Sequence, residues 1–111
     1  MFDPNDWYAA WNAHDLERVI AHYADDIRFY SPFATALVPG SNGLIRGKAA
    51  LRSYFTAALA KYPELVFVPL GTYEGAGSTT LHYKSVAGKT AAEMFVLDDH
   101  GAVIEVRAHY L

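Results

Sequence analysis

The sequence has 111 residues, which is enough for one domain with a buried core and too few for two. Its composition, with 52% hydrophobic and 19% charged residues, is that of an ordinary globular protein, and its formal net charge is −3. The nine Lys and Arg residues form no run, which argues against nucleic acids and anionic membranes as partners, and the lack of cysteine excludes disulfides and thiol nucleophiles.

Neither a membrane segment nor a secretion signal is predicted. No apolar stretch approaches the roughly 20 residues that span a bilayer. Residues 1–6 lack the basic start and apolar run of a signal peptide. We therefore expect a single domain over residues 1–111 and a cytoplasmic location.

Two short helices are predicted at the start of the chain, joined by a turn that contains Asn and Asp. The first carries Trp7, Ala10 and Trp11 on one face, at the i, i+3, i+4 spacing of a buried stripe. The second begins at Asp15, which can cap it, and keeps an apolar face as far as Tyr23. An Asp pair then ends this second helix.

Residues 27–30 predict a strand, which the pair Ser31-Pro32 stops. Residues 33–47 are predicted to be an irregular loop around a turn at 39–43, of a length typical of a lid or a mobile segment. A third helix follows over residues 48–62, where apolar residues recur at helical spacing before a proline.

The rest of the chain predicts a sheet, with strands at 65–73, 78–86, 89–97 and 102–111. Short turns separate these strands, so neighbours must run antiparallel. Three helices followed by such a sheet is an α+β layout in which the helices cover one face of the sheet.

The order of these elements and several short motifs resemble the nuclear transport factor 2-like superfamily, in particular its SnoaL-like and ketosteroid isomerase-like proteins. The motifs are WNAHDL (11–16), YADD (23–26), Pro32, GKAALR (47–52) and DHG (99–101). The resemblance implies a cystatin-like cone, in which three N-terminal helices pack on a curved antiparallel sheet and enclose a pocket. This fold hosts isomerases, cyclases, epoxide hydrolases and binding proteins, so it does not select an activity.

The catalytic positions that the resemblance implies are only partly kept. The catalytic Asp of ketosteroid isomerases falls at Ser31, and the two oxyanion-hole groups fall at Trp7 and Glu93. A serine hydroxyl cannot replace a carboxylate base. In the SnoaL-like cyclases, the Asp of the last strand falls at Ala108 and the pocket His falls again at Glu93. Neither catalytic set is complete.

Glu93 is the first catalytic candidate because it interrupts an apolar strand and shares its face with Phe95 and Leu97. If that face points into the cone, the carboxyl lies in apolar surroundings and its pKa should rise. It would then serve as general acid, general base or hydrogen-bond donor. The alternative is an outward Glu at a dimer rim or in a salt bridge.

His82 is the second catalytic candidate. A tight turn at residues 87–88 would pair Val86 with Lys89 and place His82 opposite Glu93 on one face. A carboxylate-oriented imidazole is a plausible proton shuttle. A structural role is the alternative, because a one-residue slip would move the two side chains to opposite faces.

Aromatic residues make up 14% of the chain and suit the wall of a pocket as well as a core. We expect the ligand-binding wall to include Trp7, Trp11, Phe29, Ser31, Phe33, Tyr54, Phe55, Phe95, Ala108 and Tyr110. The five His residues show no metal-ligand spacing, so neither a metal nor another cofactor is predicted.

The predicted ligand is a small hydrophobic molecule that bears a carbonyl or hydroxyl group. If the protein is an enzyme, we expect cofactor-free isomerisation, cyclisation or dehydration in which Glu93 and His82 move protons. The alternatives are a binding module without turnover and a sheet face that binds another protein. We also predict a homodimer through the outer sheet face, where Glu105, Arg107 and His109 alternate with apolar residues.

Overall fold

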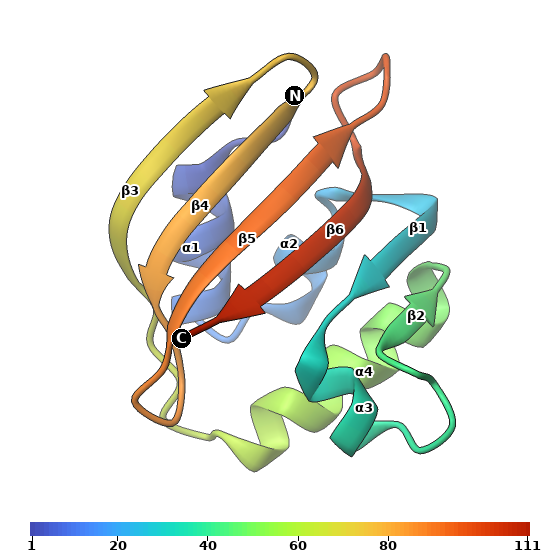
Figure 1. Cartoon of the computed structure of the whole chain (residues 1–111), viewed down its shortest axis with the longest axis vertical. Helices are drawn as coiled ribbons and strands as arrows, with labels where there is room; N and C mark the ends of the chain where they lie inside the picture. The colour runs from blue at the N-terminus through green and yellow to red at the C-terminus, as the bar shows by residue number, and fades with distance from the viewer.

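The computed structural model describes all 111 residues, which form four helices and one six-stranded sheet. The elements are α1 (Pro4–Asn12), α2 (Leu16–Ile20), β1 (Tyr23–Tyr30), α3 (Pro32–Leu37), β2 (Leu44–Arg46), α4 (Lys48–Lys61), β3 (Val68–Gly75), β4 (Ser78–Lys84), β5 (Thr90–Leu97) and β6 (Val103–Tyr110). Figure 1 shows a curved sheet with α1 and α2 behind it and α4 across its lower end. The α+β cone predicted from the sequence is confirmed, with one more helix than expected.

The two N-terminal helices begin where their capping residues predict. The side chain of Asp3 accepts hydrogen bonds from the backbone N–H groups at the start of α1, and Asp15 does the same for α2. However, α2 ends at Ile20, and residues 23–26 belong to β1 rather than to the helix. The physical reason is tertiary, since Tyr23 lies beside Val103 in the sheet and sequence periodicity does not detect that pairing.

The irregular loop predicted at residues 33–47 is wrong. Ser31 Oγ accepts a hydrogen bond from Phe33 N at 3.2 Å and caps α3, which has a proline in its first turn. A serine–proline pair that stops one strand can therefore also start a helix. The chain then turns at Gly43, whose φ is +82° and where a Cβ would lie 3.2 Å from Ser31 O, and enters β2.

The sheet has the strand order β2-β1-β6-β5-β4-β3. Its last four strands pair antiparallel as predicted. The pairing of β1 with β6 is parallel, which the sequence did not indicate, because most of the chain lies between these two strands. This pair places the first strand of the chain beside the last one, inside the sheet.

The hairpin between β4 and β5 contains a bulge. Lys89 N donates to Val86 O at 3.1 Å, as the predicted turn requires, while Lys89 O accepts from Ser85 N at 2.8 Å. Both Ser85 and Val86 therefore lie opposite Lys89, and β4 holds one extra residue. Every pair beyond the turn is shifted by one position relative to the predicted register.

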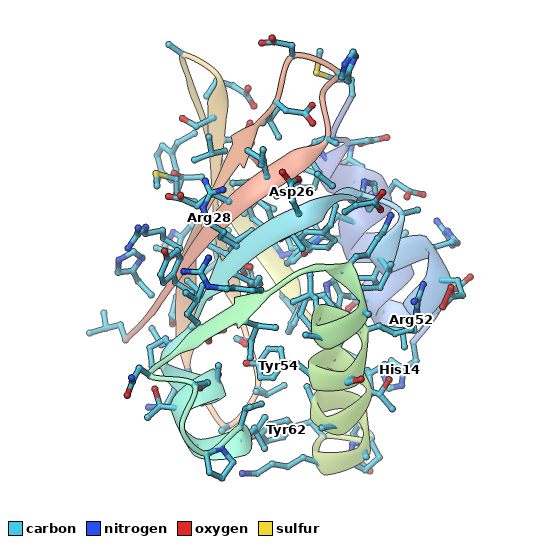
Figure 2. The ribbon with its side chains drawn as sticks, turned by 90° about the vertical axis from the view of Figure 1, so that its right-hand side faces the viewer. His14, Asp26, Arg28, Arg52, Tyr54 and Tyr62 are labelled. Carbon is cyan, nitrogen blue, oxygen red and sulfur yellow. The ribbon has the colours of Figure 1, made fainter.

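The outer face of the sheet carries a charged cluster. Glu105 accepts from Arg28 at 3.0 Å and from Arg107 at 3.2 Å, and the Arg107 guanidinium lies 3.9 Å from the centre of the Tyr30 ring. Figure 2 shows Arg28 on the far side of the sheet from α4. The outward direction predicted for Glu105 and Arg107 is confirmed, whereas the homodimer stays a prediction.

None of the four helices combines the length and the apolar character that crossing a membrane would require.

Candidate functional site

An apolar cavity of about 50 Å³ lies between the helices and the inner face of the sheet. Its wall comes from α1, β1, α3, α4, the segment before β3, and the strands β4 to β6. Of the 16 residues that line it, 14 are hydrophobic, and the other two are Ser85 and Glu93. Glu93 is therefore the one carboxyl group in an otherwise aromatic and aliphatic enclosure.

Most of the predicted wall lines this cavity. Its members are Trp7, Trp11, Phe29, Phe33, Tyr54, Phe55 and Tyr110. Figure 2 shows Tyr54 on the side of α4 that faces the sheet, with Arg52 on the other side. The aromatic residues predicted on the helices thus line one cavity, whereas ligand binding by them stays a prediction.

Three predicted wall residues lie outside the cavity lining. Ser31 is buried and caps α3. Phe95 is fully buried and stacks on Phe2, with ring centres 4.8 Å apart. Ala108 is buried and lies opposite Glu93 in the sheet. All three residues are therefore part of the buried interior without lining the cavity.

Glu93 points inward, as predicted, and only 3% of its surface is exposed. The Tyr83 hydroxyl donates a hydrogen bond to Glu93 Oε1, and no Lys, Arg or His forms an ion pair with this carboxyl. Burial raises the pKa of Glu93 to about 7, and the hydrogen bond from Tyr83 opposes this rise. Both the acid and its carboxylate are therefore populated near neutral pH.

Tyr83, and not His82, is the residue of β4 that forms a hydrogen bond with Glu93. The bulge puts Leu81 opposite Glu93 and pairs His82 with Ala92, so the predicted His82–Glu93 pair is wrong. His82 instead lines a shallow outer groove that also contains His109. The alternation of β4 already contains the signal, since apolar Leu81 and Tyr83 alternate with polar neighbours and both side chains are buried.

Other lining residues were not predicted as part of the wall. Ala58 and Tyr62 belong to the apolar face predicted for the helix at residues 48–62, and they show that the cavity extends further along this face than expected. The others come from α3, which was predicted as a loop, or from the irregular segments next to β3 and β4, and they are Leu37, Leu65, Phe67, Ser85 and Val86.

Buried tyrosines surround Glu93. Burial, with a further contribution from the charge of Glu93, raises the pKa of Tyr8 to about 12 and the pKa of Tyr23 and Tyr83 well above the usual value. Burial is also the main reason why the pKa of Tyr54 rises to about 12. These phenols stay protonated at neutral pH, so they act as hydrogen-bond donors and not as bases.

The indole N–H groups of the two tryptophans differ in their hydrogen bonding. Trp7 Nε1 donates to the Tyr23 hydroxyl at 3.0 Å, so the indole at the family's oxyanion position is already engaged. Trp11 Nε1 is buried and has no hydrogen-bond partner. Trp11 lines the cavity as a residue, so its ring contributes apolar surface to the wall.

No group of three or more His, Cys, Asp or Glu side chains is placed to hold a metal ion. The residues with polar groups in the cavity lining are Glu93, Ser85, four tyrosines and two tryptophans.

Comparison with known proteins confirms the resemblance found in the sequence. The family model of the SnoaL-like domain matches residues 5–110. A solved SnoaL-like protein of unknown function from Burkholderia thailandensis is 34% identical, and the match covers 96% of this chain and 89% of that one with a TM-score of 0.92. A comparison with curated proteins finds no match.

Two more distant structures share the fold. An NTF2-like protein of unknown function from Burkholderia pseudomallei is 18% identical, with 96% of this chain and 86% of that one covered and a TM-score of 0.75. The epoxide hydrolase/cyclase-like enzyme SalBIII, which has a role in pyran ring formation in salinomycin, is 15% identical, with coverage of 96% and 86% and a TM-score of 0.73. The chain belongs to the SnoaL-like family of proteins with the NTF2-like cone fold.

Proposed function

We propose that the cone binds a small apolar molecule with a carbonyl or hydroxyl group and catalyses a cofactor-free proton transfer on it. The observation that carries this proposal is Glu93, a buried carboxyl in an apolar cavity whose pKa is raised to about 7. A group with a pKa near the working pH is suited to both taking and returning a proton. Isomerisation, cyclisation and dehydration are the reactions that such a group serves.

In the proposed reaction, the Glu93 carboxylate removes a proton from the carbon next to a carbonyl. The electron pair of the broken C–H bond moves into an enolate, whose negative charge lies mainly on oxygen. The phenols of Tyr54 and Tyr110 come from residues of the cavity wall and can donate hydrogen bonds to this oxygen. Where the substrate also has a C=C bond conjugated with this enolate, protonated Glu93 returns the proton to the far carbon of the conjugated system. The C=C bond moves by one position, which completes an isomerisation.

The family relationship supports this class of chemistry. SalBIII, which shares the fold, takes part in a ring-forming reaction. The resemblance alone does not select the reaction, because the Asp positions of the family's known enzymes hold Ser31 and Ala108 here. Glu93 must therefore supply the catalytic carboxyl.

The test uses a simple ketone, 2-pentanone, and follows exchange of its α-protons in D₂O by NMR. We expect the protein to accelerate this exchange, and Glu93→Gln to reduce the acceleration by at least about 10²-fold, the usual size of general acid–base catalysis. Because the ionised carboxylate is the base, the rate should rise with pH through the pKa of about 7. Glu105→Gln, a matched change on the outer face, should leave exchange unaltered. Equal rates for the protein and Glu93→Gln would contradict the proposal.

The second candidate is a binding module without turnover, which the missing Asp residues at positions 31 and 108 favour. It predicts that 2-pentanone binds without accelerated exchange, and that Glu93→Gln changes affinity alone.

A further inference from the structure

The cavity beside Glu93 is small. Its volume of about 50 Å³ is roughly a third of the 150 Å³ that holds a benzene ring in an apolar protein cavity. The space beside Glu93 therefore has room for a few non-hydrogen atoms. A ligand of ordinary size has to place most of its atoms elsewhere.

A groove continues from the mouth of the cavity. It has a volume of about 340 Å³ and lies between the end of α4, residues 63–66 and the β4–β5 turn. The groove and the cavity share the lining residues Tyr62, Leu65, Ser85 and Val86. Figure 2 shows Tyr62 near the end of α4, further along the helix than Tyr54 and on the same side.

One wall of this mouth is held in place by side chains from the end of α1 and from the turn between α1 and α2. Asn12 Nδ2 donates to Phe67 O at 3.0 Å, and Phe67 N donates to Asn12 Oδ1 at 2.7 Å. His14 Nε2 forms a hydrogen bond with Leu65 O at 2.8 Å. These contacts fix the segment between α4 and β3, so the opening is a built feature of the fold.

The remaining residues around the mouth are partly exposed to solvent. Tyr62 and Val86 are both of intermediate burial, and Ser85 and Ala87 beside Val86 have short side chains. The groove carries one cation, Lys61, and one carboxylate, Glu64, so it offers no net charge to a ligand. A neutral apolar chain fits this surface better than a charged one.

We infer that the ligand is a carbonyl compound with an unbranched apolar chain, whose carbonyl end lies beside Glu93 and whose chain leaves between Tyr62 and Val86 into the groove. This inference rests on the proposed function for the carbonyl end. The chain and its path follow from the size of the cavity and its continuity with the groove.

The test measures the affinity of linear methyl ketones from 2-butanone to 2-undecanone by calorimetry. If the chain enters the groove, affinity should rise with each added CH₂, by up to about fourfold, which corresponds to about 0.8 kcal/mol per buried CH₂. Val86→Trp should obstruct the mouth and flatten this series. Val68→Trp, the same change at an exposed position of β3 outside both spaces, should leave the series unchanged.

A series that is flat from 2-butanone onward would overturn the chain path and leave the carbonyl site intact. A gain that survives Val86→Trp in a folded variant would overturn the exit at this mouth. If no ketone binds, the proposed carbonyl site fails and the inference fails with it.

A measurement on the unmodified protein covers the case in which Val86→Trp does not fold. In ¹H–¹⁵N spectra, 2-undecanone should shift the amide signals of Lys61, Glu64 and Ala87, and 2-butanone should not. Equal effects of the two ketones on these amides would overturn the proposed path.

Discussion

Two glutamates on neighbouring strands, one on each face of the sheet, have opposite properties. Glu93 on the inner face is buried without a cation, and burial raises its pKa to about 7. On the outer face, hydrogen bonds from Arg28 and Arg107 hold the pKa of Glu105 below its usual value. In this protein, the face of the sheet on which a glutamate lies therefore decides whether its carboxyl can exchange a proton near neutral pH.

The difference arises from what covers each face. The inner face of the sheet meets Trp7, Tyr8 and the other aromatic side chains of the helices, which exclude water from Glu93. The outer face is open to solvent, and its carboxyl has two arginine partners within hydrogen-bond distance. Three experiments test this difference between the two faces of the sheet.

The largest expected effect is a loss of stability when a side chain packed on the inner face is shortened. Phe95 is fully buried on the inner face, whereas the adjacent Met94 lies on the outer face and is half buried. Phe95→Ala should lower the free energy of unfolding by about 3–5 kcal/mol because it leaves a cavity under α1. Met94→Ala should cost about 1 kcal/mol, since its side chain keeps solvent contact in the folded protein. Urea unfolding of both variants measures the difference, and equal losses would refute the assignment of the two faces.

A smaller effect concerns the pH dependence of stability. The folded protein binds a proton at Glu93 up to pH 7, whereas in the unfolded chain this carboxyl has its ordinary pKa of 4.5. Stability should therefore fall as the pH rises from 4.5 to 7, by roughly 3 kcal/mol for such a pKa difference.

Glu93→Gln removes this titration and keeps an acceptor for Tyr83. It should be more stable than the unmodified protein at pH 8 and equal to it at pH 4, below the ordinary pKa of the carboxyl, as measured by chemical unfolding. Glu105→Gln is the control and should not alter the slope between these two pH values. An unchanged slope in Glu93→Gln would show that Glu93 is not the titrating group.

The smallest expected effect concerns the hydrogen bond to Glu93, and it distinguishes Tyr83 from the adjacent His82 in β4. Tyr83→Phe removes the hydrogen bond to Glu93 and should cost about 1–2 kcal/mol of stability. Because that bond favours the ionised form, its loss should move the pKa of Glu93 above about 7. A ¹³C NMR titration of the glutamate carboxyls measures this shift. His82→Ala should leave the titration unchanged, and a shift in that variant would restore the predicted His82–Glu93 contact.

The sequence predicted some residues of the candidate site and missed others. Glu93 was found because a carboxyl in an apolar strand stands out and its neighbours fix its face. Tyr83 was missed because its contact with Glu93 depends on the register of the hairpin, and the bulge at Ser85 and Val86 has no clear sequence signal. The cavity mouth was missed because it is formed by irregular segments at residues 63–67 and 85–87.

The sequence by itself determined the elements whose signals are local. Caps and periodicity located α1 and α4, and strand alternation located the inward face of Glu93, because each pattern depends on a few neighbouring residues. Tertiary structure alone decided the parallel pairing of β1 with β6, the partner of Glu93 and the small volume of the cavity. These features depend on how side chains from distant segments pack together and on which residues pair across strands. No local sequence pattern encodes the packing or the pairing.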